Sequence, residues 1–187
     1  TIQYSTNFTK NFKTSGHKFS MDFQYEDTNE DEYSTIATNS VLTDKVKTLD
    51  KQTEILLQSD YVLPIGENSQ FEMGYRGNFN TAITDYRVDL LNESTNEFEI
   101  DNNLSNVFNY KVYINAAYTQ FGSKINKFSY LLGLRMENTR TTIDQPTSGY
   151  FKKKNITGFF PTINLNFELS EKENITLGYS RRLQRPR

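Results

Sequence analysis

Apolar and polar residues alternate with a period of two along most of the chain. The clearest run covers residues 71–80, where the odd positions are Phe, Met, Tyr, Gly and Phe and the even positions are Glu, Gly, Arg, Asn and Asn. Successive side chains of a β-strand point to opposite faces of the sheet. The run therefore predicts a strand with one apolar face and one hydrated face.

Seven further runs follow the same pattern, so the sequence predicts about eight strands. Their expected apolar positions are Ile2, Tyr4, Thr6 and Phe8; Phe19, Met21, Phe23 and Tyr25; Ile55, Leu57 and Tyr61; Phe108, Tyr110, Val112, Ile114, Ala116 and Tyr118; Phe128, Tyr130, Leu132, Leu134 and Met136; Phe159, Ile163, Leu165 and Phe167; and Ile175, Leu177 and Tyr179. Phe121 has the opposite parity to its run, which places it in a turn or a bulge. Pro161 predicts a bulge or a missing hydrogen bond.

The connections between these runs are of two kinds. Four are tight and rich in Gly, Asn, Ser or charge, as hairpin turns are: residues 13–17, 65–68, 122–126 and 170–174. Three are longer and polar, covering about residues 27–50, 87–104 and 143–153. The run from Lys127 to Thr142 would span about 50 Å at ~3.3 Å per residue, whereas strands of globular sheets usually have about 3–10 residues. Long strands with short turns at one end and long loops at the other are typical of an outer-membrane barrel.

Composition supports a geometry that separates apolar from polar side chains. The mean hydropathy is −0.70, yet aromatic residues make up 14% of the chain, with 12 Tyr and 14 Phe. A disordered polar chain would be poor in aromatics, and the sequence has no stretch approaching the ~20 apolar residues that a spanning helix needs. The net charge of −2 gives no indication of nucleic-acid binding, and the absence of cysteine excludes disulfides and thiolate chemistry.

The predicted polar face carries charges that a dry core would not tolerate unpaired, and a hydrated lumen accommodates them. They are Glu54, Asp60, Glu72, Arg76, Lys111, Arg135, Glu137 and Arg182. Aromatics near the tight turns fit an interfacial girdle, or reflect only the strand preference of aromatic residues; they are Phe12, Phe19, Tyr61, Phe71, Phe128 and Phe167. Strand glycines allow bends or close packing; they are Gly74, Gly133, Gly158 and Gly178.

Three further features of the sequence are candidate binding or catalytic sites. His17, the single histidine, is expected to be a solvent-exposed turn residue because no catalytic or metal-binding partner accompanies it. Residues 27–31 resemble the start of a calcium loop, but the loop glycine and terminal glutamate are missing. A solvated extracellular loop is expected, with weak divalent-ion or lipopolysaccharide contact as the alternative. Lys152, Lys153 and Lys154 are expected to be a solvated loop end, with contact to anionic lipopolysaccharide as the alternative. No catalytic set, cofactor motif or metal cluster is evident, so the sequence indicates a protein that is not an enzyme and binds no cofactor.

The C-terminal segment carries a family resemblance. Residues 159–165 (FFPTINL) lead through a tight turn to residues 177–186 (LGYSRRLQRP), and residues 58–64, 71–74 and 130–139 agree in the same order. These stretches closely resemble the outer-membrane β-barrel family of Bacteroidetes, whose members are TonB-dependent-receptor-like. The residues that match the family signature are Ser180, Arg181, Arg182, Arg185 and Pro186.

This resemblance implies a plugged barrel of about 22 strands in the outer membrane that takes up a substrate with the help of TonB. The sequence shows neither a plug nor a TonB motif, so residues 1–187 are expected to be an internal segment of one barrel domain. Its expected partners are outer-membrane lipid, lipopolysaccharide, the plug and TonB of the full-length protein, with Arg182 a possible contact to the lumen or plug.

Two alternatives remain. One is a stand-alone eight-stranded outer-membrane barrel with a structural or adhesion role, which would require the first and last strands to pair. The other is a soluble surface β-sandwich binding module, which would bury the apolar face against a second sheet.

Overall fold

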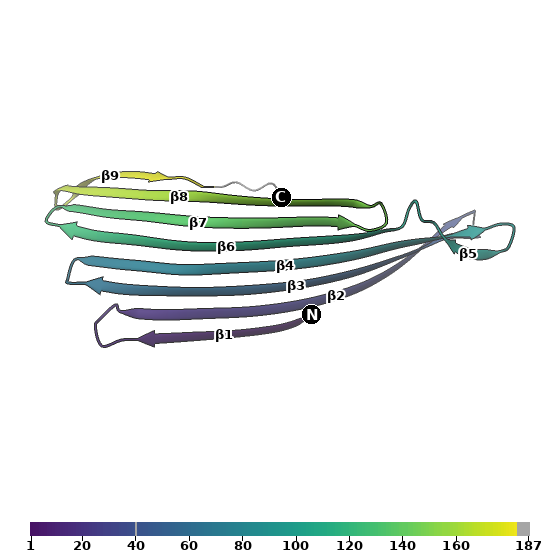
Figure 1. The fold of residues 1–187 in the computed structure, drawn as a ribbon, viewed down its shortest axis with the longest axis horizontal. Coiled ribbons are helices and arrows are strands. Elements are labelled where there is room, and N and C mark those ends of the chain that lie inside the picture. The colour runs from purple at the N-terminus through teal and green to yellow at the C-terminus, as the bar shows by residue number, and fades with distance from the viewer. Residues whose placement is uncertain (40, 183–187) are drawn as a thin grey trace.

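The computed structural model describes residues 1–39 and 41–182, and every regular element in them is a β-strand. The strands are β1 (Ile2–Asn11), β2 (Lys18–Thr38), β3 (Val41–Ile65), β4 (Ser69–Asn92), β5 (Glu97–Ile100), β6 (Asn106–Ile125), β7 (Phe128–Gln145), β8 (Tyr150–Ser170) and β9 (Glu173–Ser180). They form one antiparallel sheet in the order β1-β2-β3-β4-β6-β7-β8-β9, with β5 paired only to β4. Figure 1 shows this as a single layer of long strands lying side by side in chain order. The predicted all-β, up-and-down architecture is confirmed.

The eight predicted strands correspond to β1–β4 and β6–β9, and β5 is an additional ninth strand. It pairs with the end of β4, from Asp89↔Ile100 to Asn92↔Glu97. This strand of four residues lies within the segment that the sequence pattern assigned to a loop.

The long loops predicted from polarity are largely strand. Residues 27–38 and 41–50 form the outer parts of β2 and β3, whose pairing continues to Thr38↔Val41, with one register shift between Ile36 and Ala37. Likewise β7 and β8 extend to Gln145 and Tyr150. Here both sides of the sheet carry polar residues, so no apolar period marks the strands, although their backbones still pair.

The four connections predicted as tight turns, β1–β2, β3–β4, β6–β7 and β8–β9, all lie at one end of the sheet, on the left in Figure 1, while the hairpins of β2–β3 and β7–β8 lie toward the other end. The predicted turn at residues 122–126 is shorter than expected: β6 runs to Ile125, and only Asn126 and Lys127 separate it from β7. Asn126 has a φ of 53°, a left-handed conformation that asparagine tolerates better than most residues.

The register of β6 corrects its predicted faces. Phe121 lies directly opposite Phe71 of β4 and Leu132 of β7, within ladders that show no register shift, so it is neither in a turn nor in a bulge. Odd-numbered β6 residues therefore share the face of the apolar residues of β4 and β7. The expected apolar set lies on the opposite, polar face; it is Phe108, Tyr110, Val112, Ile114, Ala116 and Tyr118. Lys111, expected on the polar face, lies on the apolar side. The prediction was wrong because aromatic and apolar residues occur on both parities of β6, and only pairing with neighbouring strands distinguishes them.

Pro161 pairs with Leu134 in a ladder without a register shift, so no bulge forms there. Residues 1–39 and 41–182 also contain no helix long and apolar enough to cross a membrane.

The sheet has almost no interior. Among the described residues, only Val88 and Ala116 are buried hydrophobic side chains. The accessible surface of the chain is 13528 Å², whereas a compact protein of 21.8 kDa would expose about 9,300 Å². The fold is therefore a single sheet whose apolar face is not covered by any described part of the chain.

Candidate functional site

The two faces of the sheet are chemically distinct, and the interstrand register defines them. The apolar face carries the even residues of β1 and β7 and the odd residues of β2, β3, β4, β6, β8 and β9, because directly paired residues project to the same side. One row across this face reads Leu63, Phe71, Phe121, Leu132, Ile163 and Tyr179. The opposite side is called the polar face below.

Large side chains on the apolar face are exposed. Met73 is 48% exposed, Leu134 47% and Phe159 53%. Monomeric soluble proteins rarely expose contiguous apolar patches larger than a few hundred Å². An apolar surface that extends over eight neighbouring strands therefore requires a non-aqueous environment.

The apolar surface forms a belt of nearly constant height. It covers Phe71–Phe79 on β4, Phe128–Met136 on β7 and Phe159–Phe167 on β8, nine residues on each strand. Eight steps of ~3.3 Å correspond to about 26 Å along the strand, close to the ~25 Å apolar band of outer-membrane barrels.

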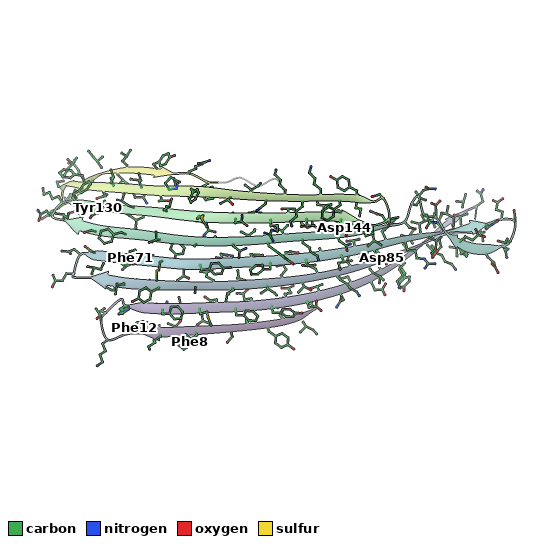
Figure 2. All side chains as sticks on the ribbon, in the orientation of Figure 1. Phe8, Phe12, Phe71, Asp85, Tyr130 and Asp144 are labelled. Carbon is green, nitrogen blue, oxygen red and sulfur yellow. The ribbon has the colours of Figure 1, made fainter. Side chains whose placement is uncertain are left out.

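Beyond the belt the same face becomes polar, as Figure 2 shows for two strands. Phe71 and Tyr130 lie toward the tight turns, whereas Asp85 and Asp144, on the same β4 and β7, lie far toward the other end. A belt placed close to the tight turns leaves the other ends of the long strands outside it. The acidic residues at that end are thus kept out of the apolar layer.

The polar face carries a hydrogen-bonded network in the same part of the sheet. Tyr118 Oη donates to Asp60 Oδ1 at 2.6 Å, Gln120 Nε2 donates to Glu72 Oε2 at 2.5 Å, and Arg135 pairs with Glu137 at 3.1 Å. Further along the strands, Asn80 donates to Glu54 at 2.7 Å and Thr84 to Asp50 at 2.5 Å. These hydrogen bonds pair polar side chains that would have no partners among the apolar side chains of the belt on the opposite face.

Gly74 of β4 allows the hydrogen-bonded network to pass over that strand, from β6 to β3. A Cβ at this position would clash with the Tyr118 ring and would lie 2.6 Å from Asp60 Oδ1 and 2.8 Å from the carbonyl oxygen of Ser59. The tyrosine of β6 thus lies over the glycine of β4 and reaches the aspartate of β3. The Phe160 ring covers Gly158 in a similar way, with Cζ 2.6 Å from the ideal Cβ position. Close packing at these two predicted glycines is confirmed.

Most, but not all, of the charged residues expected on the polar face lie there. Glu54, Asp60, Glu72, Arg76, Arg135 and Glu137 lie on it. Lys111 lies on the other side of the sheet, in the row Thr81–Lys111–Thr142–Lys153 just beyond the belt.

His17 is half-buried, not the solvent-exposed turn residue expected from the sequence. Its ring stacks on Phe12 with centroids 4.0 Å apart, and its Nε2 lies 2.9 Å from the Tyr61 hydroxyl. The tight β1–β2 turn brings the histidine back over Phe12 while pairing of β2 with β3 supplies Tyr61. The arrangement indicates a structural contact at the tight-turn end of the sheet.

Residues 27–31 lie in β2 and not in the solvated loop that the sequence predicted. Thr53 donates to Asp27 at 3.0 Å, and Lys47 lies 3.9 Å from Asp31. No group of three potential metal ligands occurs within residues 1–39 and 41–182. On the neighbouring part of β4, Asp89 accepts a hydrogen bond of 2.9 Å from Arg87 and raises the pKa of that guanidinium above its ordinary value.

The family-signature residues lie at the end of β9. Ser180 is its last residue and pairs with Thr162, and the backbone N–H of Arg181 still donates to Pro161 O on β8 at 3.2 Å. Arg182 follows and is exposed. Arg185 and Pro186 lie outside the described residues.

The comparisons with known proteins agree with this geometry. Residues 10–187 match the model of the outer membrane protein beta-barrel family. The ferric citrate transporter FecA in its unliganded form is similar with a TM-score of 0.59 and 16% identity, over 93% of this chain and 26% of that chain. The ferric yersiniabactin uptake receptor FyuA from Yersinia pestis has a TM-score of 0.59 and 10% identity, over 93% of this chain and 27% of its own. No curated protein matches the chain. The chain thus spans about a quarter of the length of these two solved structures.

Proposed function

Because the chain belongs to the outer membrane protein β-barrel family, we propose that it forms part of the wall of a larger, TonB-dependent-receptor-like barrel that takes up a substrate across the outer membrane. The observation that carries the proposal is the exposed apolar belt on one side of a sheet whose other side is a hydrogen-bonded polar surface. In a barrel wall the belt contacts lipid and the polar face encloses the lumen.

The open edges of the sheet support a barrel with more strands. β1 and β9 stand at the two ends of the strand order, and each pairs with only one neighbour among the described residues. Within a membrane every backbone N–H and C=O must be paired, so these two edges need partner strands. The two solved structures that resemble the chain are about four times as long, which leaves room for such strands and for a plug.

The orientation follows from the position of the belt along the strands. The belt lies close to the turns β1–β2, β3–β4, β6–β7 and β8–β9, whereas the β2–β3 and β7–β8 hairpins extend well beyond it at the other end. Outer-membrane barrels have short periplasmic turns and longer extracellular extensions, so we assign the four turns beside the belt to the periplasm. The β2–β3 hairpin and β5 then project outside the cell. The partners in this arrangement are outer-membrane lipid and lipopolysaccharide at the belt, the plug in the lumen, and TonB in the periplasm.

The strand order of the full-length protein tests the wall assignment. A structure of the purified full-length protein is expected to show further strands paired with β1 and with β9, and a plug against the polar face. Direct pairing of β1 with β9 would instead establish the stand-alone eight-stranded barrel. A second sheet packed on the belt would establish the soluble sandwich.

Arg182 tests the contact with the plug. Pairing of Arg181 with β8 continues the alternation of β9, which directs residue 182 toward the polar face. A plugged barrel conducts few ions in a planar bilayer, so Arg182→Ala in the full-length protein is expected to raise conductance while folding is unchanged. Arg181→Ala is the matched control, expected to leave conductance as it is; equal conductance of both variants and the parent would contradict the plug contact.

A further inference from the structure

Three basic residues meet on the apolar face just beyond the belt. Lys111 of β6 and Lys153 of β8 flank Thr142 of β7 in one row, so their Cα atoms lie about 10 Å apart at ~4.8 Å per strand. Arg140, two residues from Thr142 on the same side of β7, completes a triangle with them. All three side chains are exposed, and they are called the basic patch below.

The basic patch carries uncompensated positive charge. Among the described residues, none of its three side chains takes part in an ion pair or a side-chain hydrogen bond. Asp144 is the nearest acidic residue on this face, one row farther from the belt, and it accepts a hydrogen bond of 3.4 Å from Asn109. Two lysine ammonium groups and one arginine guanidinium around the Asp144 carboxylate give this region a net charge of about +2.

Pairing of β8 separates the three consecutive lysines that the sequence presents as one cluster. Lys153 pairs with Thr142 and belongs to the basic patch, whereas Lys152 pairs with Ile143 and Lys154 with Thr141, both on the polar face. These lysines lie in a strand and not at a loop end. Only Lys153 of the three therefore lies on the apolar face, and Lys152 and Lys154 serve as controls of equal charge on the polar face.

On β7 and β8, the residues between the basic patch and the belt are amides and a hydroxyl that bond to one another. Asn138 donates to Asn155 Oδ1 and to Thr157 Oγ1, each at 2.8 Å. On β6, Asn115 accepts a 2.6 Å hydrogen bond from the Tyr75 hydroxyl. The basic patch thus stands at the boundary where the apolar layer gives way to a polar one.

An apolar groove lies on the belt side of this boundary and crosses β6. It has a volume of about 620 Å³ and is lined on the apolar face by Ala117 and Thr119, with Met73, Tyr75, Leu134 and Met136 beside them. The small side chains of β6 lie between larger ones on β4 and β7, which makes the surface hollow along that strand. The row of Ala117 is about 20 Å from Lys111 at ~3.3 Å per residue.

We propose that this surface of β6–β8 binds lipopolysaccharide, with a phosphate of its headgroup on Lys111, Arg140 and Lys153 and an acyl chain in the groove over Ala117 and Thr119. The site deepens the lipid partnership of the proposed function, and it rests on the outward orientation of the β7–β8 hairpin. Charge-assisted bonds from Lys and Arg to phosphate are strong, and basic residues beside a membrane attract anionic headgroups. A single occupant of this chemistry accounts for both the charged and the apolar part of the surface.

Binding of lipopolysaccharide to the detergent-solubilised full-length protein tests the site. The triple variant Lys111→Gln/Arg140→Gln/Lys153→Gln is expected to weaken binding ten- to a hundredfold. The double variant Arg140→Gln/Lys153→Gln is compared with Lys152→Gln/Lys154→Gln, which removes equal charge from the other face and is expected to bind as the parent does. Equal loss in the two double variants would overturn the assignment to this face.

Chemically altered probes distinguish the parts of the ligand. Lipopolysaccharide stripped of phosphate is expected to bind the parent as weakly as the intact lipid binds the triple variant, and Ala117→Trp is expected to weaken the intact lipid by filling the groove. Competition by inorganic phosphate at matched concentration, or equal binding of phosphatidylglycerol, would overturn the choice of lipopolysaccharide.

The orientation is tested separately. The variant Ser148→Cys, in the β7–β8 hairpin, is expected to react with an impermeant thiol reagent on intact cells. Lack of reaction there would overturn the orientation given under the proposed function and the cellular role of the site. The binding measurements in detergent report on the basic patch itself.

Discussion

The hydroxyl of Tyr118 on β6 donates a hydrogen bond of 2.6 Å to Asp60 on β3, across the strand that separates them. The ring can take this path because it lies over Gly74 of β4, where no Cβ intervenes. Such aromatic cover of a strand glycine pins the register of neighbouring strands. Three strands of the wall are thereby joined on the side that faces the proposed lumen.

Substituting Gly74 tests this joint. Gly74→Ala is expected to destabilise the folded full-length protein by about 1–3 kcal/mol, because the new methyl group meets the Tyr118 ring and the carbonyl oxygen of Ser59. Urea unfolding in lipid vesicles measures the difference. In Gly74→Ala/Tyr118→Ala the clash with the ring is gone, so the double variant is expected to lose less than the sum of the two single variants.

Gly122→Ala is the matched control on the same face. The nearest atom to an added Cβ there is Leu131 Cδ1 at 3.5 Å, an ordinary contact. Lower entropy of the unfolded chain is expected to leave this variant neutral or more stable by up to about 1 kcal/mol. A similar loss in both variants would show that any side chain at a strand glycine is harmful and that the joint has no special role.

Adjacent leucines test which face contacts lipid. Leu132 is 47% exposed on the apolar face, whereas Leu131, the preceding residue on β7, lies opposite Gly122 on the polar face. Leu132→Lys is expected to cost about 2 kcal/mol more than Leu131→Lys, since only the former places an ammonium group in hydrocarbon. The free energy of folding into vesicles measures both; a larger cost for Leu131→Lys would reverse the assignment of faces.

Spin labels test the register of β6 directly. Residues 1–187 contain no cysteine, so Thr119→Cys and Gln120→Cys can each be labelled alone once any cysteine elsewhere in the full-length protein is replaced. The label at 119 is expected to collide more often with oxygen, which concentrates in hydrocarbon, than with a water-soluble nickel complex. The label at 120, on the side of Glu72, is expected to show no such preference for oxygen. Exchange of the two patterns would place the predicted set, Phe108 to Tyr118, in contact with lipid after all.

The contact of His17 with two aromatic rings is expected to stabilise the tight-turn end of the sheet. His17→Ala removes stacking on Phe12 and the hydrogen bond with Tyr61, which together contribute about 1–2 kcal/mol. Thermal unfolding of the full-length protein measures the loss. Lys13→Ala, an exposed change in the same turn, is expected to have no effect; a loss equal to that of His17→Ala would mean that the turn, and not the ring contact, is sensitive.

Some features of the site could be predicted from the sequence, and others could not. Alternation in residues 71–80 identified the belt on β4, and it did so because those side chains face two different media. The same reasoning missed the outer parts of β2 and β3, where both faces meet water and polarity carries no period. It also described His17 as exposed, since nothing local indicates that Tyr61, 44 residues away, would lie against it.

The sequence by itself determined that this protein is a sheet of long antiparallel strands with one face for lipid, because a period of two separates the faces of a strand. Only the tertiary structure decided how the strands are aligned. Pairing with β4 and β7 places the odd residues of β6 on the apolar face. Phe121 therefore lies in the belt, and Lys111 lies on the same face as Arg140 and Lys153. Within one strand either parity was acceptable, and the hydrogen bonds to neighbouring strands made the choice.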